Sequence, residues 1–91
     1  MKVVIETRVF ETEKAKKHWE VAYWDGNNMH KGDLYLTTRG TFYAYTPSQW
    51  ANMHRWVILS KDEVIEFAGH WFQDDPETLE EILGLLKVEA E

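Results

Sequence analysis

The chain contains no cysteine, so its four histidines are the side chains best suited to metal binding or to acid–base chemistry. The absence of thiols excludes disulfides, thiol nucleophiles, iron–sulfur clusters and thiolate zinc sites. No two histidines stand at the one-, three- or four-residue spacings that place two metal ligands on one face of an element. Folding could still bring His18, on an expected strand, near His70, on an expected helix. The spacing itself predicts no metal site, and nothing in the sequence indicates a cofactor. The four histidines are His18, His30, His54 and His70.

The serines and carboxylates likewise show no catalytic arrangement. Ser48 and Ser60 lack the strained, glycine-flanked turn of a serine nucleophile, and Ser60 is explained by helix capping. Neighbouring acids such as Asp74 and Asp75 stand side by side at a helix start, whereas a general acid and base face each other across a cleft. We therefore predict that the protein is not an enzyme.

Aromatic side chains are unusually frequent, with five Trp, four Tyr and four Phe making 14% of the chain. So many rings exceed the obvious needs of a small core, and alternation along a strand places Phe42 and Tyr43 on opposite faces. Trp and Tyr are also the residues that serve protein interfaces best. The sequence therefore predicts an exposed, partner-binding aromatic face. Its candidate residues are Trp24, Tyr35, Tyr43, Tyr45 and Arg39.

Residues 39–45 also resemble the basic-glycine-aromatic strand of an RNA-recognition motif, whose rings stack on bases. The strand–helix–strand opening of that motif is absent, and Thr41 stands where an aromatic residue would follow Gly40. The net charge of -6 opposes binding to phosphates. Binding of single-stranded nucleic acid is therefore the alternative to a protein partner, and no membrane partner is expected.

The charge is distributed unevenly along the chain. Residues 1–60 hold six acids and eight bases, a balance of +2, whereas residues 61–91 hold ten acids and two bases, a balance of -8. The ordinary interpretation is a solvated helix face. The functional interpretation is an acidic surface that meets a basic partner or mimics nucleic acid.

Alternating apolar and polar residues predict strands over residues 2–10, 18–24, 34–38 and 41–45. In the first of these strands the alternation places Val3, Ile5, Thr7 and Val9 on one side. Turn-forming residues predict a loop over 25–33. Between the last two strands, Arg39 and Gly40 predict a hairpin turn with Gly40 in the left-handed conformation. The short connections favour a meander.

Residues 46–59 carry two patterns. Thr46, Pro47 and Gln49 form a helix start, whereas residues 56–59 are large, apolar and mostly strand-favouring. We favour a short helical turn near residues 47–53 followed by a strand or extended segment. The sequence leaves open whether residues 47–59 are helix or strand.

Two helix starts follow. Ser60 and Glu63 make a capping box for a helix that ends before Asp74, and Asp75 caps a second helix with Pro76 in its first turn. The apolar period changes from two to 3.6 at Ser60, which predicts an α+β fold. We expect an antiparallel meander of four to five strands, packed on one face by two C-terminal helices that form a hairpin.

The 91 residues suffice for one domain, residues 1–91. The apolar runs are short and Glu6 interrupts the N-terminal run early, so no signal peptide is expected and the protein is predicted to be soluble and cytoplasmic. Residues 34–43 followed by residues 56–63 resemble a hairpin and capped helix of small uncharacterised bacterial and phage proteins. The resemblance implies a structural role for these residues and an accessory role for the protein. We predict a non-enzymatic interaction module that binds a protein partner or forms a homodimer.

Overall fold

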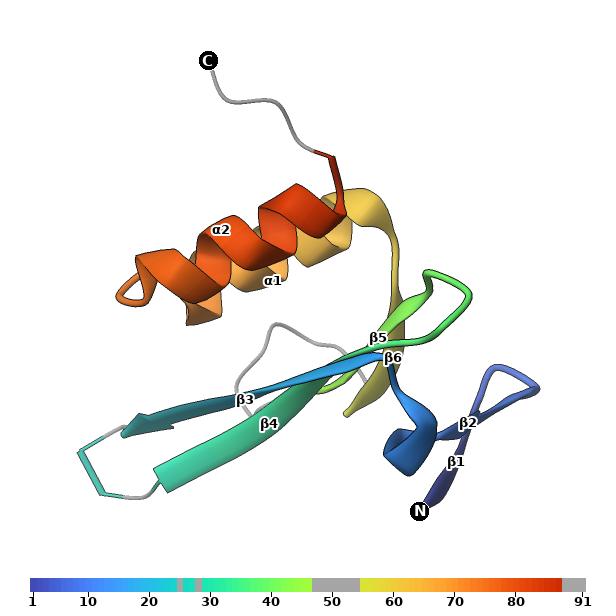
Figure 1. The fold of residues 1–91 in the computed structure, drawn as a ribbon. Helices are drawn as coiled ribbons and strands as arrows, with labels where there is room; N and C mark the ends of the chain where they lie inside the picture. The colour runs from blue at the N-terminus through green and yellow to red at the C-terminus, as the bar shows by residue number, and fades with distance from the viewer. Residues whose placement is uncertain (25, 28, 47–54, 88–91) are drawn as a thin grey trace. The chain divides into compact units, whose positions relative to one another are not determined.

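The computed structural model describes residues 1–24, 26, 27, 29–46 and 55–87, without the side chains of Tyr23 and Trp24. The chain divides into two compact units, residues 1–59 and residues 60–91. The first unit holds the strands and the second holds the two α-helices (Figure 1). The predicted α+β class is confirmed, and a single domain over residues 1–91 stays a prediction.

Four antiparallel strands form the main sheet of the first unit. Its strands follow one another in the order β3-β4-β5-β6, so each pairs with its neighbour in sequence. The predicted meander is therefore confirmed, with four strands. Their bounds are β3 (Lys17–Trp24), β4 (Met29–Leu36), β5 (Phe42–Tyr45) and β6 (Trp56–Leu59).

Strand β4 begins earlier than the sequence pattern suggests. Residues 29–33 belong to this strand, so the prediction of a loop over residues 25–33 is wrong. Here cross-strand pairing outweighs the polar, loop-like composition, since Lys31, Gly32 and Asp33 lie opposite Ala22, Val21 and Glu20 of β3. Both strands consequently extend over eight residues.

The N-terminal residues form a hairpin and not the predicted single strand. β1 (Lys2–Ile5) pairs with β2 (Arg8–Glu11) in a separate two-stranded sheet. The chain reverses at Glu6 and Thr7, whose φ angles are 52° and 75°. This two-residue turn breaks the expected alternation, so Val9 is 63% exposed instead of lying buried beside Val3 and Ile5.

Apolar contacts join this hairpin to one face of the main sheet. Val3, Ile5 and Phe10 form a buried cluster with Tyr35 and Tyr43 of the sheet. The Phe10 ring lies 4.4 Å from the Tyr43 ring, and the Tyr35 ring lies 4.9 Å from the Tyr43 ring, measured between centroids. The first unit therefore has an aromatic core between its two sheets. Beside the hairpin, residues Thr12–Lys14 make a turn of 3-10 helix, η1.

The turn between β4 and β5 has the predicted conformation at Gly40, whose φ is 89°. The Gly40 amide donates to the Thr37 carbonyl at 3.0 Å, and the Thr41 amide donates to Thr37 Oγ1 at 3.0 Å. Further along, β6 confirms the predicted extended segment. The predicted helical turn at residues 47–53 lies outside the described residues.

The second unit contains α1 (Lys61–Trp71) and α2 (Pro76–Leu85). The capping box is confirmed, since Ser60 Oγ accepts from the Glu63 amide at 3.3 Å and Glu63 Oε1 accepts from the Ser60 amide at 3.0 Å. Asp75 caps α2 by accepting from the Thr78 amide and hydroxyl, which lowers the pKa of Asp75. The two helices contact each other, as predicted. Of the described helices, none has the length and apolar character needed to cross a bilayer.

Candidate functional site

Two members of the predicted aromatic face belong to the core. Tyr35 is 7% exposed and Tyr43 is 0% exposed, so the prediction that their rings lie on an open face is wrong. The physical reason is the N-terminal hairpin, whose Phe10 packs on the Tyr43 ring. Burial raises the pKa of Tyr43, as expected for a phenol removed from water.

Tyr45 stands two positions from Tyr43 on β5 and shares its face of the sheet, whereas Arg39 lies on the turn before that strand. Tyr45 is half-buried, with the Arg55 guanidinium 4.3 Å from its ring centroid and the Trp56 ring at 4.7 Å. Trp24 lies on β3, and its side chain is outside the described part of the structure. Arg39 is exposed at the turn before β5 and lines a pocket elsewhere in the first unit.

That pocket, called here the basic pocket, has a volume of about 610 Å³. Four parts of the first unit line it: the start of β1, the strand β2, the end of η1 with Ala15, and the turn from β4 to β5. Four of its lining residues are basic and one is acidic, a local balance of +3. A concave surface of this charge favours anionic ligands. The lining residues are Lys2, Arg8, Val9, Phe10, Glu11, Lys14, Ala15, Thr37, Thr38 and Arg39.

The basic side chains of the pocket differ in how they are engaged. Lys14 Nζ forms an ion pair with Glu11 Oε2 at 2.8 Å, which lowers the pKa of the Glu11 carboxyl and raises that of Lys14. The Arg8 guanidinium carbon lies 5.2 Å from the Phe10 ring centroid. Within the described residues, Arg39 makes no ion pair. The same holds for Lys2, so Arg39 and Lys2 are the exposed cations of the pocket that a ligand can engage.

The pocket also includes a strand edge. All four residues of β2 line it, and among the described strands β2 pairs only with β1. A strand paired on one side presents unpaired backbone donors and acceptors along its other edge. The pocket thus combines basic side chains with backbone groups that an extended chain could bind.

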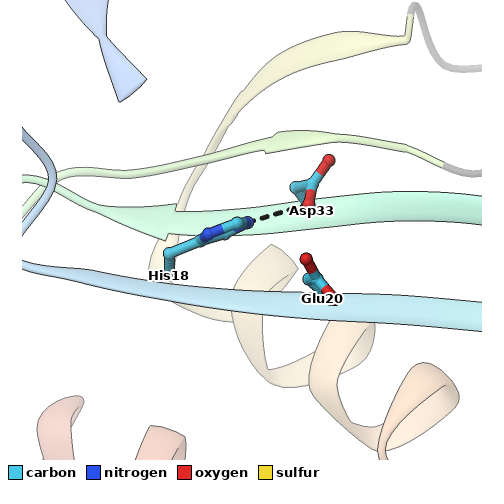
Figure 2. A group of neighbouring side chains, drawn as sticks. All are labelled: His18, Glu20 and Asp33. Atoms are coloured by element: carbon cyan, nitrogen blue, oxygen red, sulfur yellow. Dashed lines mark hydrogen bonds and ion pairs between the residues drawn. The ribbon is translucent and has the colours of Figure 1, made fainter. Parts of the chain in front are cut away.

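A second group of chemically active side chains lies on the main sheet. His18 and Glu20 stand two residues apart on β3, and Asp33 lies opposite Glu20 on β4. The strand period of two therefore places these three residues, called here the triad, on one face. His18 Nε2 lies 2.8 Å from Asp33 Oδ1, and one ligand atom from each residue lies within 4.8 Å of the others (Figure 2).

The His18 ring is held in place by a ring from the core. It stacks on Tyr35 with the centroids 4.4 Å apart and the planes 7° from parallel. Burial, and secondly the negative charge of Asp33, raises the pKa of Tyr35 to about 12. Tyr35 is therefore a neutral phenol at physiological pH, and its ring acts as a flat support for the imidazole.

Sequence reasoning missed this triad. No two histidines stand at spacings that would join them on one face, and the polar residues around Asp33 resemble a loop. The available signal was the i, i+2 spacing of His18 and Glu20 on a predicted strand. Only the hairpin register, with Glu20 opposite Asp33, supplies the third side chain.

Comparisons of the chain with protein-family models, curated proteins and solved structures give no match. The resemblance of residues 34–43 and 56–63 to small bacterial and phage proteins therefore stays a prediction.

Proposed function

We propose that the protein is a non-enzymatic interaction module that binds an acidic, extended segment of a protein partner in the basic pocket. The observation that carries this proposal is the +3 balance of side chains around a concave surface in a chain whose net charge is -6. Charge of one sign gathered in a cleft raises the local concentration of ligands of the opposite sign. Complementary charge also selects among partners.

The shape of the pocket supports an extended peptide as the ligand. The free edge of β2 can pair with the backbone of an added strand, a mode of recognition in which main-chain hydrogen bonds supply affinity. Val9 lines the pocket and is 63% exposed, and its cross-strand partner Val4 is 68% exposed. Apolar side chains of a bound segment could pack on these two valines, while its carboxylates face Arg39 and Lys2.

The alternative, single-stranded nucleic acid, has less support. Stacking on bases needs exposed rings, and each stacked base contributes about 1–3 kcal/mol. Tyr35 and Tyr43 are buried, so two of the three tyrosines of the predicted aromatic face are unavailable to bases in this structure. A phosphate backbone could still enter the basic pocket, and the test below includes it.

The test is a titration of the full chain with a labelled peptide of alternating Glu and Val residues, followed by fluorescence anisotropy at low ionic strength. We expect saturable binding that Arg39→Glu weakens about tenfold and that high salt abolishes. Lys17→Glu is the matched control, because Lys17 is also exposed in the first unit but does not line the pocket. It changes the net charge equally, and we expect less than a twofold effect.

Four results would contradict the proposal. A peptide with Lys in place of Glu could bind equally well, or the two charge reversals could act equally. An oligothymidylate could bind in an Arg39-dependent manner while the peptide does not, which would favour the nucleic-acid alternative. Finally, light scattering could show a dimer that Arg39→Glu dissociates, which would make the acidic residues of a second copy the ligand.

A further inference from the structure

We propose that the triad of His18, Glu20 and Asp33 binds a divalent transition-metal ion, with zinc as the best-fitting probe. The site lies on β3 and β4 and shares no residue with the basic pocket, so the inference is independent of the proposed function. One imidazole nitrogen and two carboxylate oxygens form a ligand set that zinc accepts. Imidazole favours zinc and its neighbours over magnesium and calcium, which prefer oxygen ligands alone.

The distances in the triad suit a single small ion. Zinc lies about 2.0–2.2 Å from nitrogen and oxygen ligands, so ligand atoms around a tetrahedral ion are separated by about 3.3 Å. The three donor atoms here lie within 4.8 Å of one another, and the closest pair, His18 Nε2 and Asp33 Oδ1, is 2.8 Å apart. Side-chain rotations on two fixed strands can therefore produce the required geometry. Figure 2 shows the His18 ring reaching across from β3 to Asp33, with Glu20 beside it.

The local electrostatics also favour a cation. Glu20 and Asp33 are directly opposed on neighbouring strands, and like charges in that position destabilise a sheet. Within the described residues, His18 is the only side chain that forms an ion pair with either carboxylate. The same face also carries, by register, Lys31, two positions before Asp33, and the titratable side chains of Tyr35, Tyr43 and Tyr45. Lys31 is the charge that would compete with a metal ion.

The support for His18 distinguishes this group from an ordinary surface ion pair. Stacking on Tyr35 fixes the ring, and the side chain of His18 is 40% exposed while that of Asp33 is 29% exposed. An ion can therefore reach ligands that are partly ordered beforehand. The metal would take the place of the hydrogen bond between His18 Nε2 and Asp33 Oδ1. Three protein ligands leave at least one coordination position for water.

The test is a titration of the intact protein with zinc by isothermal titration calorimetry, together with NMR of the histidine ring protons. We expect one equivalent to bind, with selective shifts of the His18 ring resonances. Asp33→Asn, which keeps the shape of the side chain, should weaken binding tenfold or more, as should His18→Gln. His70→Gln is the control, since this exposed histidine lies on α1, and it should leave the affinity unchanged.

Three outcomes would overturn the site. Zinc could fail to bind one equivalent, the His70 variant could lose as much affinity as the His18 variant, or magnesium could bind as tightly as zinc. Circular dichroism of each variant shows whether it is folded. If Asp33→Asn does not fold, the histidine ring resonances of the unmodified protein decide the question. Zinc that shifts the resonances of other histidines and leaves those of His18 unchanged would also rule the site out.

Discussion

The two hairpin turns of the first unit reverse the chain with different residues. The turn from β4 to β5 has its left-handed residue at Gly40, with φ of 89°, whereas the turn from β1 to β2 has left-handed Glu6 and Thr7, with φ of 52° and 75°. Left-handed backbone costs about 1–2 kcal/mol for a residue with a Cβ, and glycine adopts it freely. The first turn therefore stores strain that the second turn avoids.

The difference shows what maintains each hairpin. Two successive left-handed residues match the twist of the strands that a two-residue turn connects, so the backbone shape of the first turn is favourable. Glu and Thr, however, are not residue types that prefer this backbone conformation. Val3, Ile5 and Phe10 are buried against Tyr35 and Tyr43, and this burial offsets the strain. The second hairpin has a turn that is locally favourable and belongs to a four-stranded sheet. The first hairpin thus depends on tertiary contacts more than the second does.

The largest expected effect comes from removing the contact that anchors the first hairpin. Phe10→Ala should lower the free energy of unfolding by about 3–5 kcal/mol, because it deletes a buried ring and leaves a cavity beside Tyr43. Urea unfolding followed by Trp fluorescence measures the change. Val9→Ala, on the exposed side of the same strand, should change it by about 0.5 kcal/mol or less. Equal effects of the two variants would show that the hairpin is not held by its buried face.

A smaller effect is expected at the second turn. Gly40→Val places a β-branched residue at positive φ and should destabilise the protein by about 1–3 kcal/mol. A Cβ at Gly40 meets no atom within 4 Å, so the whole cost is conformational. Gly40→Asn should then recover most of the stability, since asparagine tolerates this conformation. If both variants unfold at the same urea concentration, the strain argument fails at this turn.

The smallest effect, and the only one expected to stabilise, is at the first turn. Thr7→Gly relieves the strain of a β-branched residue at φ of 75° but adds freedom to the unfolded chain. The net gain should be about 0.5–1 kcal/mol, visible as a higher midpoint of thermal unfolding. Thr38→Gly is the control, since Thr38 is an exposed turn residue without positive φ, and it should give no gain.

The same contrast explains which parts of the fold the sequence could predict. Gly40, Ser60 with Glu63, and Asp75 with Pro76 act through local backbone chemistry, and each was predicted at its correct position. Glu6 and Thr7 carry no local signal for a turn, so residues 2–10 resembled one strand. Their conformation is imposed by contacts with residues more than 25 positions away, as in the packing of Phe10 on Tyr43.

The candidate site was less predictable for a related reason. Arg39 was identified correctly as a surface residue, yet its pocket requires the hairpin that the sequence pattern did not reveal. The triad requires the register of β3 on β4, which places Asp33 opposite Glu20. Residue types and spacing along one strand determine only which side chains share a face. The neighbouring strand determines which of them meet.

Within the first unit, β1 contacts β6, the last strand of the main sheet. This contact has a consequence for synthesis of the chain. A hairpin forms in about 1–10 μs, but ribosomes add only about 5–20 residues per second. The roughly 45 residues between β2 and the start of β6 therefore take about 2–9 s to translate. During that interval the nascent hairpin has only part of its docking surface. Val3, Ile5 and Phe10 are then available to chaperones, and translation pauses after β2 would lengthen their exposure.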